Sequence, residues 1–233
     1  MRRLVPRASR LLYASLVWLA FGACLERDLA PVCPTVESGV IVEVRQGGAD
    51  IVDLVLLVDN SRSMDEEQAN LRANIPRLIN PLVNPPTDPA TGTPLYPPVQ
   101  DLHVAIVSSD LGTAPYSACT TSDDGLFIDT YRIADPADPQ YDATSAARTY
   151  PRYLAWTAAG AATYSAADLV RDVSCLAALG TGGCGYEQHF ESMYRALTTH
   201  LADGRNDSPA STGAFLRPNS LLALVFLADE DDC

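Results

Sequence analysis

An aspartate and two serines occupy alternate positions directly after a strongly apolar stretch of the sequence. Asp59, Ser61 and Ser63 follow residues 52–58. This spacing on one turn lets a single ion contact the carboxylate and both hydroxyls. Hard cations such as Mg²⁺ prefer oxygen ligands, keep several waters and need few carboxylates. The pattern predicts a divalent-cation site, although Asp and Ser also commonly cap helices.

A second carboxylate, that of Asp229, comes at the end of another apolar run, residues 221–228. In open α/β sheets, ligands bind at the carboxyl ends of the strands. If the strand that leads to Asp229 lies next to the one that leads to Asp59, both carboxylates reach the same rim. The glycine-rich residues 180–185 would then form a third wall.

Three apolar runs predict the strands that carry these residues. Residues 52–58 are almost continuously apolar, as expected of a central parallel strand covered on both faces, and residues 102–107 and 221–228 have the same character. Between the first two runs, residues 65–82 predict a helix. This segment begins with acids, repeats apolar residues on one face and precedes the prolines at 85–86.

Two further helices are predicted at residues 169–176, closed by Gly180, and at residues 190–201. Residues 111–160 read as an irregular insertion, in which residues 126–133 and 153–156 are possible hairpin or edge strands. The alternation of strands and helices predicts an α/β fold. The expected architecture is a doubly wound, mainly parallel sheet with helices on both faces.

The Asp-x-Ser-x-Ser motif, a Thr in a glycine-rich turn and an Asp that ends another apolar strand together resemble the metal-ion-dependent adhesion site of von Willebrand factor A domains. The resemblance covers residues 51–233 and implies a Rossmann-like fold. The motifs at 180–187 and 229–233 resemble those of such domains in environmental proteobacterial lipoproteins. Because the family's sheet normally has two further strands and helices, the resemblance implies a domain that is incomplete at its C-terminal end. The strand at 221–228 would then be an exposed edge.

The resemblance implies a role for each residue of the motif. In the family the two serines, here Ser61 and Ser63, bind the ion directly. A Thr and an Asp complete the shell directly or through water, and a ligand's carboxylate takes an open position. Asp59 and Asp229 are the acids that match this pattern in the present sequence.

The third-loop position is the one at which the sequence departs from the family. Thr181 lies in the glycine-rich turn, but the family usually has its Thr just before the start of the helix, so Glu187 or water are alternatives. The resemblance implies Mg²⁺ as the cofactor, with Mn²⁺ or Ca²⁺ as alternatives. The implied partner is a protein ligand that supplies a carboxylate.

The first residues predict export. Arginines precede an apolar stretch at residues 11–23 that is too short to span a bilayer, as in a secretory signal. The sequence ending at Cys24 resembles a bacterial lipobox, in which that cysteine carries lipid; cleavage without lipidation and an uncleaved anchor are alternatives. Residues 24–50 resemble a tether. We expect a cell-envelope lipoprotein, on the periplasmic or the surface face, that contacts the membrane only through its lipid.

Export also affects the interpretation of the cysteines. Outside the cytoplasm, cysteines form disulfides more often than they bind metal, and no C-x-x-C motif indicates zinc. Cys175 and Cys184 flank a glycine-rich turn that can bring them within bonding range, which predicts a disulfide between them. The partners of Cys33, Cys119 and Cys233 stay open.

Composition restricts the function. The formal net charge of −13 argues against nucleic acid as a partner, and the absence of lysine excludes Schiff-base chemistry. There is no G-x-S-x-G or H-E-x-x-H motif. His189 and His200 are interpreted as ordinary helix residues, and residues 122–125 as a solvated turn. The favoured function is therefore a non-enzymatic binding module; a metal-dependent hydrolase and an inert envelope scaffold are the alternatives.

Overall fold

The structure, a computed structural model, describes residues 49–113, 122–139, 141–184, 186–207 and 214–230. The chain divides into two units, Met1–Val44 and Arg45–Cys233, and every described residue belongs to the second. The predicted signal segment, Cys24 and nearly all of the tether lie outside the described residues. In the part of the chain that is described, no helix is both long enough and apolar enough to cross a bilayer.

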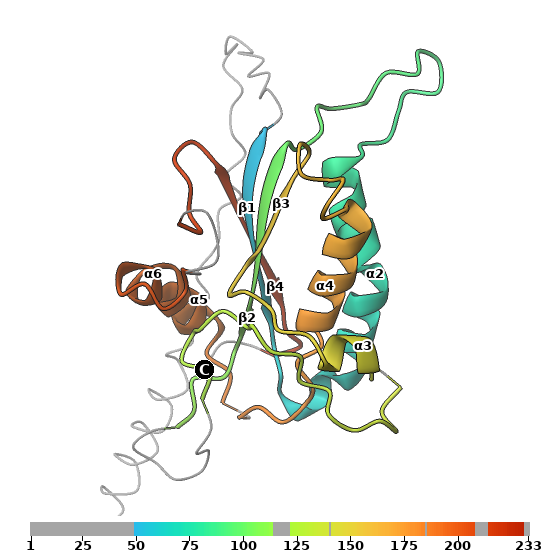
Figure 1. Ribbon diagram of the computed structural model, residues 1–233. Coiled ribbons are helices and arrows are strands. Elements are labelled where there is room, and N and C mark those ends of the chain that lie inside the picture. The colour runs from blue at the N-terminus through green and yellow to red at the C-terminus, as the bar shows by residue number, and fades with distance from the viewer. Residues whose placement is uncertain (1–48, 114–121, 140, 185, 208–213, 231–233) are drawn as a thin grey trace, which may run out of the picture. The chain divides into compact units, whose positions relative to one another are not determined.

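Four strands of the described residues form one mixed sheet in the order β3-β2-β1-β4. Strand β1 (Ile51–Val58) pairs in parallel with β2 (Asp101–Ser108) on one side and with β4 (Leu221–Leu227) on the other. Strand β3 (Leu154–Thr157) pairs antiparallel with β2. The three long strands therefore end at the same edge of the sheet (Figure 1), so the segments that follow them come close together.

Helices lie on both sides of the sheet (Figure 1). Helices α2 (Asp65–Val83) and α4 (Ala166–Leu176) pack next to each other on one side. Helices α5 (His189–Leu197) and α6 (Thr199–Ala202) lie on the other. Alternate side chains of β1 enter two separate apolar clusters, one on each side. Each buried Leu or Val contributes about 2 kcal/mol, which explains why this strand is apolar on both faces.

One polar residue interrupts the apolar run of β1. Asp53 is fully buried, and its carboxylate accepts hydrogen bonds from the backbone N–H (2.9 Å) and Nε (2.8 Å) of Arg217 and from the hydroxyl of Ser220. The Nδ1 atom of His103 lies 3.6 Å from the same carboxylate. These contacts fix the segment that leads into β4 against the start of β1.

Residues 126–133, predicted as a possible hairpin or edge strand, form no strand. The N–H of Ile128 donates to the carbonyl of Ile106 in β2 (2.9 Å), but the backbone of Phe127 bonds outside the sheet. The N–H of Phe127 donates to Oδ1 of Asn206 (2.8 Å), and its carbonyl accepts from Nη1 of Arg152 (2.9 Å). Phe127 is nevertheless completely buried, so its apolar character reflects packing in a loop. The strand predicted at 153–156 is confirmed as β3, which extends the main sheet.

Strand β4 has the predicted position but not the predicted burial. It lies at the edge of the sheet formed by the described strands, and five of its apolar side chains are more than a third exposed: Leu221, Leu222, Leu224, Val225 and Phe226. The ring of Phe226 lies 5.5 Å from that of Phe190, which is itself exposed on α5.

Candidate cation site

Asp59 is the buried centre of the loop that follows β1. Its backbone N–H donates to the carbonyl of Leu227 (2.9 Å), which joins the ends of β1 and β4. Its Oδ1 atom accepts from the N–H of Ser61 (2.8 Å) and the hydroxyl of Ser109 (2.9 Å). Within the described residues its Oδ2 atom accepts no hydrogen bond, and it lies 3.6 Å from Nε2 of His189. A bound ion or water is a usual explanation for such a buried oxygen.

The serine hydroxyls of this loop are not used to cap a helix. Ser61 precedes a short 3₁₀ helix, η1 (Arg62–Met64), but its side chain makes no capping hydrogen bond. Met64, which precedes α2, makes none either. The Oγ atoms of Ser61 and Ser63 instead lie 3.2 Å from each other. The helix-cap interpretation of these serines is therefore wrong.

Both serines line an open pocket of about 410 Å³, together with Arg62, Glu187 and Glu230. Ser61 is buried at the base of the loop, whereas Ser63 is exposed. Oxygen atoms from three separate segments of the chain thus surround one space. A ligand from solution can reach this space beside the hydroxyl of Ser63.

Glu187 places a buried carboxyl group close to other acids at this pocket. Its side chain is 1% exposed, and its Oε2 atom has no hydrogen-bond partner within the described residues. Burial raises the pKa of its carboxyl group, and the negative charges of Asp59 and Glu230 raise it further. Its own backbone N–H and His189 act in the opposite direction. A cation in the pocket would relieve this repulsion.

Carboxylates alone do not make a metal centre in this part of the molecule. The described residues contain no group of three or more His, Cys, Asp or Glu side chains placed to hold a metal ion. A cation at this edge would therefore depend on serine hydroxyls and water as well as carboxylates. Mg²⁺ tolerates such a ligand set, because it usually keeps several of its waters.

The loops after β1 and β4 lie at one edge, as expected, but the acids that follow β4 differ in their positions. Asp229 is exposed and does not line the pocket of Ser61 and Ser63, whereas its neighbour Glu230 does.

No protein-family model, curated protein or solved structure matches this chain.

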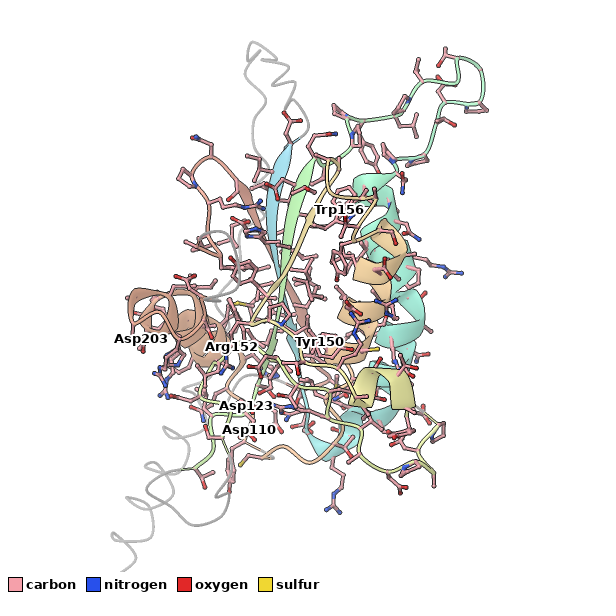
Figure 2. The ribbon with its side chains drawn as sticks, viewed as in Figure 1. Asp110, Asp123, Tyr150, Arg152, Trp156 and Asp203 are labelled. Atoms are coloured by element: carbon pink, nitrogen blue, oxygen red, sulfur yellow. The ribbon has the colours of Figure 1, made fainter. Side chains whose placement is uncertain are left out.

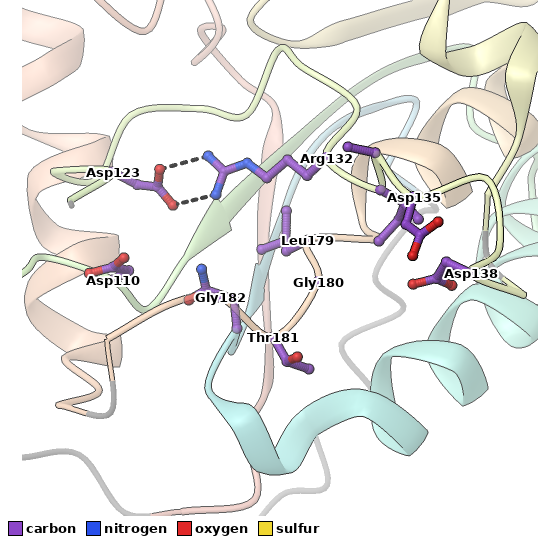
Figure 3. Close-up of a pocket in the computed structure, with 12 residues that line it drawn as sticks. Asp110, Asp123, Arg132, Asp135, Asp138, Leu179, Gly180, Thr181 and Gly182 are labelled. Carbon is purple, nitrogen blue, oxygen red and sulfur yellow. Dashed lines mark hydrogen bonds and ion pairs between the residues drawn. The ribbon is translucent and has the colours of Figure 1, made fainter.

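Thr181 is directed to a different space. It lines a second pocket, of about 550 Å³, together with Asn60, Asp110 and Gly180 (Figure 3). Glu187 is the residue of the third loop that lines the pocket of the serines. Of the two residues considered for the third-loop position, Glu187 therefore has the position that a ligand requires.

The predicted disulfide between Cys175 and Cys184 is wrong. Cys175 is a free, buried thiol on α4, and its Sγ atom lies 2.7 Å from the hydroxyl of Ser145 in the short helix α3 (Ala143–Ala146). Cys184 is disulfide-bonded, so its partner is not Cys175. Cys175 instead packs in the core beside the sheet. Cys24, Cys33, Cys119 and Cys233 also lie outside the described residues.

Two residues near Asp59 were not identified from the sequence. Ser109 follows β2, so the rule that places ligands at the ends of parallel strands also applies to it. His189 is the first residue of α5 and was interpreted as an ordinary helix residue. Its position two residues after Glu187, an alternative for the third-loop position, was the available signal, but the contact with Asp59 depends on the packing of α5 against the sheet.

Proposed function

We propose that this protein is a binding module of the von Willebrand factor A type, with a doubly wound sheet, that holds a divalent cation at the loop after β1. Asp59, Ser61 and Ser63 would hold the ion, and Glu187 would take the third-loop position. Asp229 and Glu230 would contribute through water or from the rim. Mg²⁺ is the favoured ion, with Mn²⁺ and Ca²⁺ as alternatives.

One observation carries this proposal. The hydroxyls of Ser61 and Ser63 lie 3.2 Å apart in a pocket that Glu187 also lines, beside a buried Asp59 whose Oδ2 atom has no hydrogen-bond partner within the described residues. Hydroxyl and carboxylate oxygens are suitable ligands for a hard cation. The ligand set therefore fits Mg²⁺ in chemistry. The negative charges of Asp59 and Glu187, each with one carboxylate oxygen that has no hydrogen-bond partner in the described residues, would attract the ion.

The function of such a site is to capture an acidic group. A bound Mg²⁺ supplies a coordination position that can accept a carboxylate oxygen of a protein ligand. The residues of the chain fix the position of that ion, and the exposed hydroxyl of Ser63 marks the side from which a ligand approaches. The protein would act in the cell envelope, anchored through a lipid on Cys24, as the signal-like first residues indicate.

A metal-dependent hydrolase is the second candidate, and His189 is the observation that favours it. His189 comes two residues after Glu187 in the sequence, and the fold brings its Nε2 atom to 3.6 Å from Asp59. In such an enzyme His189 would hold the carboxylate that binds the metal, because it contacts Asp59 and does not line the pocket of the serines. Hydrolysis of nitrophenyl esters or phosphates that requires Mn²⁺ or Mg²⁺, and that is lost in His189→Gln, would favour the hydrolase over the binding module.

Thermal unfolding in the presence of Mg²⁺ tests the cation site. An ion that binds only the native state raises Tm, and at a hundred times its Kd it adds about 2.7 kcal/mol to the free energy of unfolding. We expect this increase in the wild-type chain, a loss of it in Asp59→Asn and a reduction in Ser63→Ala. Ser122→Ala, a change at an exposed serine of the loop after β2, is the matched control and should keep the full increase.

A second measurement tests ligand capture. In the presence of Mg²⁺, N-acetyl-aspartate amide should bind, whereas N-acetyl-asparagine amide, which lacks the negative charge, should not. A wild-type Tm that does not respond to Mg²⁺, Mn²⁺ or Ca²⁺ would leave the chain as an inert scaffold and contradict the proposal. Equal binding of the two amides would contradict the capture of a carboxylate.

A further inference from the structure

The second pocket, of about 550 Å³, also adjoins the loop that follows β1. Asn60 lines it, whereas the next residue, Ser61, lines the pocket of the candidate cation site. In Figure 3, Asp110 and Asp123 lie on one side of the pocket and Asp135 and Asp138 on the other, and the side chain of Arg132 reaches across to Asp123 above residues 179–182. Figure 2 shows that Asp110 and Asp123 lie near one end of the sheet and Trp156 toward the other.

The charge of this pocket is predominantly negative. Four aspartates line it, and Arg132 is its one basic lining residue. Both terminal nitrogens of Arg132 donate to the carboxylate of Asp123, at 2.8 and 2.6 Å, so this guanidinium already has a partner. Asp110 accepts from the N–H of Gly112 (2.8 Å), and Asp135 accepts from that of Ala137 (2.8 Å). These amide donors are neutral, so they leave the charges of Asp110 and Asp135 uncancelled.

Asn60 supplies an observation that is independent of the acids. Its side chain is 3% exposed and lines the pocket, and its Oδ1 atom has no hydrogen-bond partner within the described residues. The amide packs closely against Gly183. A Cβ added to Gly183 would lie 2.4 Å from that Oδ1 atom. A buried amide oxygen without a donor is costly, and a ligand with N–H groups would satisfy it once the amide turns from Gly183 toward the pocket.

The remaining lining is apolar. Ile133 and Leu179 are 5% and 4% exposed, and Ala134 and two glycines lie beside them. A pocket with an apolar lining and acidic walls suits a ligand with an aliphatic stem and a cationic end, as in the side chains of Arg and Lys. Small anions and nucleic acid would be repelled by the same walls.

We propose that this pocket binds the cationic side chain of an arginine or lysine on a peptide or protein partner. The aliphatic stem packs against Ile133 and Leu179, and the guanidinium or ammonium group meets Asp135. Asp110, on the other side of the pocket, adds its negative charge. This inference goes beyond the proposed cation site and does not require it. If both sites operate, a partner would offer an acidic and a basic side chain to two pockets that adjoin the same loop.

The test uses the whole chain in EDTA, so that the cation site plays no part in the result. N-acetyl-arginine amide is the probe, and N-acetyl-citrulline amide is its uncharged control of nearly equal shape. Calorimetry or NMR titration should show binding of the arginine probe and at least tenfold weaker binding of the citrulline one, because hydrogen bonds to charged groups are roughly twice as strong as neutral ones.

Variants locate the binding. Asp135 is exposed, so Asp135→Asn should fold normally. Its affinity for the arginine probe should be about tenfold lower than that of the wild type. Asp135→Lys, which places an ammonium group at the pocket, should abolish binding. Asp88→Asn, in the loop at the opposite end of the sheet (Figure 1), is the matched control and should bind like the wild type.

Several outcomes would overturn the proposal. They are an absence of binding at millimolar probe, equal binding of the citrulline amide, and an unchanged affinity in Asp135→Lys. In a parallel titration without EDTA, stoichiometric binding of Ca²⁺ that is lost in Asp135→Asn and displaces the arginine probe would identify an inorganic cation as the occupant instead. A failure of the Mg²⁺ experiments would leave these results untouched.

Discussion

The Nε2 atom of His189 lies 3.6 Å from the Oδ2 atom of Asp59. His189 begins α5, and Asp59 follows β1, so this contact joins a helix on one side of the sheet to the loop of the candidate site. Both side chains are at least 95% buried. The histidine is therefore placed to orient the carboxylate without entering the pocket that the serines line.

We predict that His189→Gln weakens Mg²⁺ binding by about tenfold, because groups that orient a metal-binding carboxylate typically contribute 10- to 100-fold in affinity. Calorimetric titration with Mg²⁺ measures this effect. Glu191→Gln, on the exposed side of the same helix, is the matched control and should keep the wild-type affinity. An unchanged affinity in His189→Gln would mean that the histidine has only a packing role.

Two neighbouring glycines allow a test of how tightly the site loops are packed. A Cβ at Gly183 would lie 2.4 Å from Oδ1 and 2.5 Å from Cγ of Asn60, whereas a Cβ at Gly182 would meet no atom within 4 Å. Gly183→Ala should therefore lower the free energy of unfolding by about 1–3 kcal/mol, as overpacking usually does. Gly182→Ala should change it little. Urea unfolding measures both, and equal effects of the two changes would contradict this packing.

The strands could be predicted from the sequence because burial on both sides leaves a recognisable pattern. The apolar runs that became β1 and β2 have side chains in two cores, so neither run alternates with polar residues. The segment at 126–133 was predicted as a possible strand for the same reason, because it contains buried apolar side chains. Phe127 is as apolar and as buried as a strand residue, but Asn206 and Arg152 satisfy its backbone from outside the sheet. No local pattern distinguishes these two cases.

Site residues that directly follow a strand could be predicted from the sequence, because the strand order fixes their position. Site residues inside loops could not be predicted in this way. Asp59 and its serines follow β1 directly, so the parallel pairing places them. Thr181 and Asp229 lie in loops, where side-chain directions follow no fixed period, and neither lines the pocket of the serines. The disulfide prediction failed for a related reason, because it assumed a turn geometry that sequence spacing alone does not determine.

The buried ion pair of Asp53 and Arg217 should be important for stability. Asp53 is fully buried, and Arg217 is its one ionic partner besides the nearby His103 in the described residues. Arg217→Ala should lower the free energy of unfolding by about 3–5 kcal/mol, because it leaves an uncompensated buried charge. Arg195→Ala removes a half-exposed pair with Asp124 and should cost less than about 1 kcal/mol. Similar values from urea unfolding would contradict the structural role given to Arg217.

Glu187→Gln should affect stability and cation binding in opposite directions. In EDTA, the change removes a buried carboxylate that Asp59 and Glu230 repel. The free energy of unfolding at neutral pH should therefore rise by about 1 kcal/mol, as is common when a mutation removes an unfavourable interaction at a functional site. With Mg²⁺, the same change removes a proposed ligand and should reduce the increase in Tm. A residue with only a structural role would show no gain in EDTA.

The pH dependence of stability provides an independent check on Glu187. Because the folded protein raises the pKa of this carboxyl above its ordinary value of 4.5, the folded state binds the proton more tightly than the unfolded state. Its contribution to stability is therefore complete below pH 4.5 and is lost as the pH rises through the folded-state pKa. In EDTA, the wild type should lose stability relative to Glu187→Gln over that interval. If the free energies of unfolding of the two proteins change with pH in the same way, the environment of Glu187 does not disfavour its negative charge. One reason to expect a cation at this edge of the sheet would then be lost.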